Sequence, residues 1–134
     1  MIMKTTEFTQ YLKDLFPLAD FYTGMINKSN PKCVGVYAKG RAGSELAIGG
    51  VVNTSSNILP ISLLIHWTES TTLCETMAND IYDALLGQYD FTIAGRRVIS
   101  VKLLDSCPVD VSRDAGNIVE MVIRANIIYE REVI

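Results

Sequence analysis

The chain has 134 residues, of which 49% are hydrophobic and 20% are charged, with a formal net charge of -3. This length fits one domain, and the composition is that of a globular protein rather than a disordered one. No stretch has the density of Lys and Arg that phosphate backbones attract, so sequence-specific nucleic-acid binding is not expected.

Cysteine spacing and apolar run length limit the chemistry further. Cys33, Cys74 and Cys107 lie far apart, and the single histidine, His66, does not complete a zinc site with them at a familiar spacing. The longest apolar run, residues 58–67, is too short to cross a bilayer, and the N-terminus lacks the apolar core of a signal peptide. We therefore expect a soluble protein with reduced thiols, no metal, no cofactor and no membrane partner.

A helix is expected at residues 5–16. Its apolar side chains recur with the spacing of one helical stripe, namely Phe8, Tyr11, Leu12, Leu15 and Phe16. Thr5 or Thr6 can cap the start, and Pro17 disfavours helical geometry at the preceding residue. The aromatic-rich stripe must cover another element, most simply a sheet.

Two short strands follow, at about residues 20–26 and 32–38. The link between them, residues 27–31, is rich in turn-forming residues and predicts a hairpin. Residues 39–50 contain four glycines and predict a surface loop or a loosely formed hairpin, and residues 53–57 form a second polar loop.

The middle of the chain has the clearest pattern. Apolar residues alternate along residues 61–67, which predicts a strand with one apolar face formed by Ile61, Leu63, Ile65 and Trp67. A helix is expected at residues 72–86, with a buried stripe of Leu73, Met77, Ile81, Ala84 and Leu85. Thr72 and Glu75 have the spacing of a capping box, and Gly87 can supply the left-handed residue after the helix.

Two strands close the pattern. Residues 97–104 place Ile99, Val101 and Leu103 on one face, and residues 105–116 predict a loop. Apolar and polar residues then alternate over an unusually long stretch that begins at Val119 and includes Tyr129. Such a strand either crosses the middle of the sheet or projects toward a neighbour. We expect a single α+β domain with a mixed, mostly antiparallel sheet packed by helices at 5–16 and 72–86.

The search for chemistry excludes most classes of site. Residues 110–114 begin like an EF-hand loop, but Ala115 and Met121 stand where that loop needs Gly and Glu. Gly40-Arg41-Ala42-Gly43 has the G-x-x-G pattern of a KH-domain loop, yet it follows a strand rather than a helix, and a surface loop is favoured.

Cys74 near a helix N-terminus, with His66 upstream, is the one plausible nucleophile and base. A structural cysteine and a partly buried histidine are the favoured interpretation. Asp80 and Asp83 are expected on the exposed flank of the second helix, as solvating charges. We expect a protein that is not an enzyme.

The order of these elements resembles the tail terminator proteins of long-tailed bacteriophages, also called minor capsid or tail-to-head joining proteins. The resemblance covers nearly the whole chain, from the first helix through Val34-Gly35-Val36-Tyr37 and the strand at 61–67, which leads directly into the second helix. It continues through residues 78–85, the strand after Gly95, the loop containing Cys107-Pro108 and the long last strand. One departure is Val109-Asp110-Val111 after Pro108, where many members have Leu-Gly-Asp.

The resemblance implies a virion protein, assembled in the host cytoplasm, that forms a ring, commonly a homohexamer. Such a ring docks on the last ring of tail-tube subunits, ends tube polymerisation and presents a surface to the head-completion or connector protein. The long last strand and the loop at 39–50 are candidate contacts between subunits.

Lys39, Arg41, Arg96 and Arg97 are candidate contacts with a subunit or the tube, or line a lumen that DNA crosses; solvated surface charge is the alternative. Two other functional classes stay open: another neck or tail component, such as a head-completion or tail-tube protein, and a small cellular ligand-binding domain.

Overall fold

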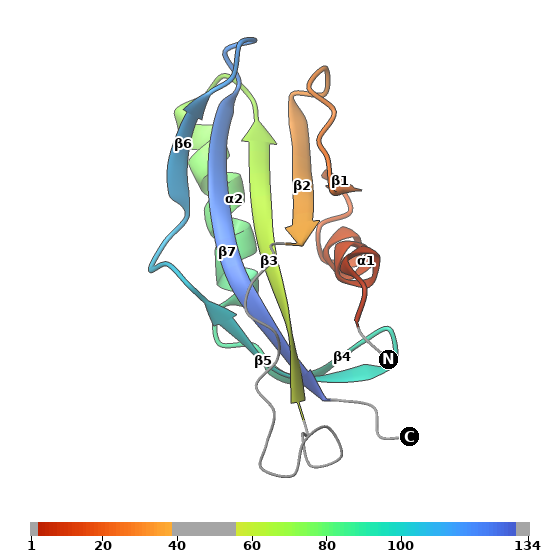
Figure 1. The fold of residues 1–134 in the computed structure, drawn as a ribbon. Coiled ribbons are helices and arrows are strands. Elements are labelled where there is room, and N and C mark those ends of the chain that lie inside the picture. Colours follow the sequence, from red (N-terminus) through yellow and green to blue (C-terminus); the bar gives the residue numbers. More distant parts are fainter. Residues whose placement is uncertain (1–2, 39–55, 131–134) are drawn as a thin grey trace.

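A computed structural model describes residues 3–38 and 56–130, which form two helices and one mixed sheet of seven strands (Figure 1). The elements in chain order are α1 (Thr5–Leu15), β1 (Asp20–Thr23), β2 (Lys32–Ala38), β3 (Ser56–Trp67), α2 (Thr71–Leu85), β4 (Tyr89–Ile93), β5 (Arg96–Leu103), β6 (Val109–Arg113) and β7 (Val119–Glu130). The strand order is β1-β2-β3-β7-β5-β4, with β6 beside β7. The predicted α+β class with a mostly antiparallel sheet is confirmed.

The long strands β3 and β7 form the centre of the sheet. They are antiparallel in register from Ser56 opposite Glu130 to His66 opposite Glu120. On its other side β7 pairs with β6 along its first residues and with β5 along its last residues, so these two strands share one border of β7 (Figure 1). Of the two placements expected for the last strand, the structure has the central one. Because described strands lie along both borders of β7, this strand is not an edge of the described sheet.

The connection between β1 and β2 differs from the predicted hairpin, because these strands are parallel. The chain reverses twice between them. Gly24, with a φ of +71°, makes the first reversal, and the polar residues near Asn27 make the second. Residues 25 and 26 pass directly against β2 at Gly35, where an added Cβ would lie 2.7 Å from Cγ2 of Ile26 and 2.8 Å from the carbonyl oxygen of Met25. Only a residue without a side chain fits there.

Both helices begin earlier than the predicted caps. The N-cap of α1 is Lys4, whose backbone N–H donates to the Glu7 carboxylate at 2.8 Å, so the prediction of Thr5 or Thr6 is wrong. The N-cap of α2 is Ser70, whose hydroxyl oxygen accepts from the Leu73 N–H at 3.3 Å. The predicted capping box at residues 72 and 75 therefore does not form the start of this helix. Gly87 has a φ of +72°, as predicted for the residue after the cap.

The buried stripe of α2 is rotated from the predicted one. It consists of Cys74, Ala78, Ile81, Tyr82 and Leu85. Leu73 is 53% exposed, and Met77 and Ala84 are only partly buried. The sequence contains two overlapping apolar stripes, and the buried one has the smaller side chains in its first two turns. Small side chains let the helix approach the sheet closely, which we take as the reason for this orientation.

The region around β5 holds two strands that were not predicted. A turn with positive φ at Ala94 and Gly95 joins β4 to β5, and β6 lies within the segment predicted as a loop. A bulge in β5 between Val98 and Ser100 changes which side chains face the core. Val101 is buried and Leu103 packs against the core, as predicted, whereas Ile99 is only partly buried and Val98 is buried instead.

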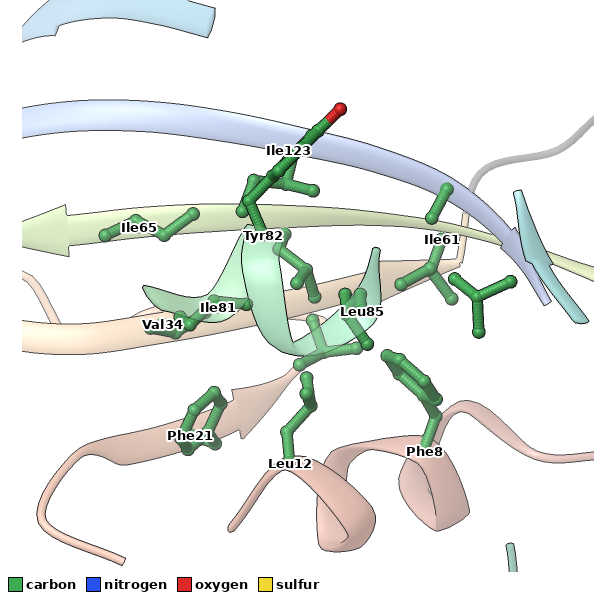
Figure 2. Close-up of a cluster of buried hydrophobic side chains, with 14 of the residues drawn as sticks. Phe8, Leu12, Phe21, Val34, Ile61, Ile65, Ile81, Tyr82, Leu85 and Ile123 are labelled. Atoms are coloured by element: carbon green, nitrogen blue, oxygen red, sulfur yellow. The ribbon is translucent and has the colours of Figure 1, made fainter. Parts of the chain in front are cut away.

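Both helices pack against the same face of the sheet, which we call the covered face. Figure 2 shows Phe8 and Leu12 of α1 together with Ile81 and Leu85 of α2 and side chains of the sheet strands. The β3 and β7 residues in this core are Leu59, Ile61, Leu63, Ile65, Val119, Met121, Ile123, Ala125, Ile127 and Tyr129. This confirms the predicted apolar face of β3. Tyr129 also accepts a hydrogen bond from the Met3 N–H at 3.0 Å.

Candidate functional site

The second face of the sheet, called here the open face, has no helix against it among the described residues. Its most distinctive feature is His66 on β3, which is fully buried. Its Nδ1 lies 3.0 Å from a carboxylate oxygen of Glu120, so this nitrogen donates the hydrogen bond. Its Nε2 lies 3.7 Å from Asp114, too far for a hydrogen bond.

The cluster around His66 contains no nucleophile aimed at the imidazole. Cys33 is opposite His66 in the register of β2 and β3, but its thiol points to the backbone carbonyls of Asn27 and Asn30, at 3.6 and 3.5 Å. Burial raises the pKa of the Cys33 thiol. The arrangement joins β3 to β7 and to the turn that follows β6.

The structure separates the two residues that the sequence suggested as nucleophile and base. Cys74 lies on α2 against the covered face, whereas His66 lies on the open face. The Cys74 thiol is 3.7 Å from the carbonyl oxygen of Val119, and burial raises its pKa to about 11. The thiolate is therefore rare at neutral pH. In the described part of the chain, no three or more His, Cys, Asp or Glu residues are grouped to hold a metal ion.

The four predicted interface cations do not form one described cluster. Lys39 and Arg41 lie outside the described residues. Arg96 and Arg97 begin β5 next to the turn from β4, with Arg96 partly buried. Arg97 contacts Asp90 at 2.7 Å and Glu130 at 3.3 Å, and the hydrogen bond to Asp90 is the main cause of its raised pKa. Arg97 thus joins the β4–β5 hairpin to the end of β7.

The outer face of α2 carries exposed carboxylates. Asp80 and Asp83 are exposed, as predicted, and Glu75 lies on the same helix. None of the three makes an ion pair with another described residue. Solvation of the helix surface explains these charges.

An apolar groove that was not predicted from the sequence lies between the end of α1 and α2. The groove has a volume of about 480 Å³ and is lined by Leu15, Phe16, Pro17, Leu18, Ala19, Lys32, Trp67 and Met77. Leu18 is 100% exposed, although it stands among apolar neighbours. Apolar residues directly after the helix-ending proline were the available signal. A concave apolar surface of this kind is a common feature of protein contact sites.

A second exposed surface lies along β6, and we call it the β6 edge. This strand pairs with β7 on one side, and no described strand lies on its other side. Val109 and Val111 are 44% and 50% exposed, and Asp110 between them makes no ion pair with a described residue. Arg113 holds the end of the strand by donating to the carbonyl oxygens of Glu69 and Asn117 and to the Thr71 hydroxyl.

Comparison of the chain with known protein families and with curated protein sequences finds no match. Within residues 3–38 and 56–130, neither helix is long and apolar enough to span a membrane. The apolar groove and the β6 edge are exposed surfaces with apolar side chains among the described residues. Both have the chemistry of surfaces that contact other proteins.

Proposed function

We propose that this chain is a structural subunit of a long-tailed bacteriophage, the tail terminator. In this role it forms a ring, commonly of six copies, on the last ring of tail-tube subunits. The ring stops addition of further tube subunits and gives the head-completion or connector protein a surface to bind.

The observation that carries the proposal is the order of elements. An N-terminal helix precedes the first strands, β3 leads through three residues into α2, and long β7 is the last of the seven strands. This is the order on which the resemblance to tail terminators rests. Two features depart from that order as expected from the sequence: β1 and β2 are parallel and do not form a hairpin, and β4 and β6 are additional strands.

The surface chemistry supports an assembly role over a reaction site. A cyclic ring needs two different contact surfaces on each subunit, because every copy binds one neighbour on each side. The apolar groove and the β6 edge are two such surfaces. Among the described side chains, the buried Cys74 thiol contacts the carbonyl oxygen of Val119, and the His66 imidazole is hydrogen-bonded to Glu120. Contacts of this kind are typical of residues that stabilise a fold.

Deletion of the gene from the phage or prophage that carries it tests the proposal. Electron microscopy should show tail tubes that exceed the normal length and lack heads, because nothing stops their polymerisation. Expression of the wild-type chain from a plasmid should restore the normal length, which controls for effects on neighbouring genes.

Other outcomes of this deletion identify the alternatives. Tails of normal length without heads indicate a head-completion protein, and complete absence of tubes indicates a tail-tube subunit. Normal virions contradict every virion role and leave the ligand-binding domain as the interpretation.

A further inference from the structure

We propose that His66 is a pH-sensitive switch, which ties the turn between β6 and β7 to β3 when its imidazole is positively charged and loosens that tie when it is neutral. The turn consists of residues 114–118 and is called here the 114–118 turn. Histidine is the side chain whose charge ordinarily changes between about pH 5 and 8. All the groups involved lie within one chain, so the switch goes beyond the proposed function and does not depend on it.

Each of the two ring nitrogens of His66 faces a carboxylate. Nδ1 lies 3.0 Å from an oxygen of Glu120, and Nε2 lies 3.7 Å from an oxygen of Asp114. A neutral imidazole has one N–H, so while Nδ1 donates to Glu120, Nε2 presents a lone pair to Asp114. Nε2 is buried and has no hydrogen-bond partner among the described residues. Protonation makes both nitrogens donors, each of which then faces an acceptor.

The Asp114 carboxylate divides its oxygens between the turn and the ring. Its Oδ1 accepts from the backbone N–H groups of Gly116 and Ile118, both at 2.9 Å, and so shapes the turn. Its Oδ2 is the oxygen that faces Nε2. An approach of roughly 1 Å would give the usual length of a hydrogen bond between charged groups. The charged ring therefore attracts the carboxylate that shapes the turn, whereas the neutral ring offers it only a lone pair.

Other ionisable groups near the ring do not take over this role. On β2, burial raises the pKa of the Cys33 thiol and of the Tyr37 phenol, so both are uncharged over the range in which histidine titrates. Asp20 on β1 lies two strands away in the same row of register partners and accepts from the Asn30 amide at 2.7 Å. Lys32 lines the apolar groove instead. The ring charge thus acts mainly on the two carboxylates in contact with it.

Arg113 extends the effect beyond the turn. Its guanidinium donates to the carbonyl oxygen of Asn117 within the turn at 3.0 Å. It also donates to the carbonyl oxygen of Glu69 at 2.7 Å and to the Thr71 hydroxyl at 3.2 Å, where β3 passes into α2. A turn held by the charged ring therefore steadies the start of α2 as well. The backbone pairing of β3 with β7 does not involve the imidazole, so the sheet stays intact in both states.

NMR spectroscopy of the ring tests the geometry directly. His66 is the only histidine of the chain, so labelling histidine with ¹⁵N gives its two nitrogen signals without overlap. In the neutral ring the proton should reside on Nδ1, beside Glu120, and Nε2 should have the chemical shift of a nitrogen with a lone pair. A neutral ring with its proton on Nε2 overturns the switch, because that form would already donate toward Asp114.

Hydrogen exchange of the turn tests the tie between the ring and the turn. The protection factors of the Gly116 and Ile118 amides, corrected for the intrinsic effect of pH, should fall about threefold to tenfold as the ring signals report loss of charge. His66→Gln should abolish this dependence, because glutamine does not titrate. Protection that does not follow the ring charge in the wild-type chain, or a dependence that persists in His66→Gln, overturns the proposal.

An isosteric substitution should reverse the direction of the effect. The carboxamide of Asp114→Asn keeps an acceptor for the two turn amides and offers an N–H to the lone pair of Nε2. The neutral ring should then hold the turn, so the protection of Gly116 should rise as the ring loses its charge. Asp20→Asn is the matched control and should keep the wild-type dependence, because its carboxylate is two strands away. An Asp114→Asn variant with the wild-type dependence overturns the switch.

Discussion

The two faces of the central strands differ in the side chains that they carry. On the covered face of β3, Leu63 and Ile65 are fully buried in the apolar core beneath both helices. On the open face of the same strand, a partly exposed Leu64 stands between buried Ser62 and His66. Adjacent residues of one strand therefore meet a dry core and a mixed polar surface.

The two faces contribute differently to folding: the covered face supplies stability, and the open face helps to select the strand register. The covered face buries apolar area, which is the main favourable contribution to folding. The open face contributes fewer apolar contacts but holds paired polar groups, such as His66 with Glu120, which depend on correct strand register. A slip of one residue between β3 and β7 would separate that pair and expose the core side chains.

The largest effect is expected from truncating the covered face. Leu63→Ala should lower the free energy of unfolding by about 2–5 kcal/mol, because it leaves a cavity in a close-packed core. The matched control is Leu64→Ala, one residue away on the open face, with an expected loss of about 1 kcal/mol or less. Urea unfolding followed by circular dichroism measures both. Equal losses would contradict the contrast between the faces.

A glycine substitution tests whether the open face is also closely packed at one point. Gly35→Ala should lower the free energy of unfolding by about 1–3 kcal/mol, because the new Cβ would overlap Ile26 and the Met25 carbonyl. Gly116→Ala is the control, since its Cβ would meet Asp114 at 3.4 Å, an acceptable distance. A tolerated Gly35→Ala would show that the link between β1 and β2 moves freely.

A double-mutant cycle sharpens the account of the polar pair. His66→Ala and Glu120→Ala each remove one partner of the hydrogen bond, and their coupling energy should be about 1–2 kcal/mol. Unfolding measurements on both single variants and the double variant give this energy. A coupling below about 0.3 kcal/mol would mean that burial alone holds His66 in place.

Alkaline pH gives a separate test of the burial of Cys74 on the covered face. Because burial raises the pKa of Cys74 to about 11, the folded chain holds a proton there that the unfolded chain releases near pH 9. The free energy of unfolding should therefore fall as pH rises between about 9 and 11, and Cys74→Ala should weaken that dependence.

Thiol labelling at pH 8 gives an independent check of the same burial. Exposed Cys107 should react first, whereas Cys33 on the open face and Cys74 under α2 should react slowly. Mass spectrometry identifies the modified residue. Rapid labelling of Cys74 would contradict its placement beneath α2.

Sequence periodicity predicted the elements that have one strongly apolar side. The helices, β3 and β7 repeat apolar residues over ten or more positions, so the pattern rises above chance. β4 and β6 have only five residues each and are largely exposed, so neither has a regular apolar face that the sequence pattern could reveal. The sequence pattern did not predict the parallel pairing of β1 and β2, because Gly24 adds a chain reversal before the polar turn.

The candidate surfaces were harder to predict than the fold. The groove combines residues from α1, β2, β3 and α2, so only tertiary packing brings them together. Likewise, the partners of Arg97 lie at Asp90 and Glu130, and no local pattern links those positions. The sequence suggested cations available for other molecules at this hairpin, whereas Arg97 forms ion pairs with Asp90 and Glu130 of the same chain.

The central position of β7 has a consequence for the order of events during synthesis. The last of the seven strands supplies the middle of the sheet and borders β3, β5 and β6. The contacts that complete the domain therefore join residues far apart along the chain, and such topologies fold slowly. While the ribosome is still making β7, β6 has no partner and the sheet is divided. A growing chain thus cannot complete the sheet until synthesis has passed Glu130, so the domain reaches its final fold only after β7 has been made.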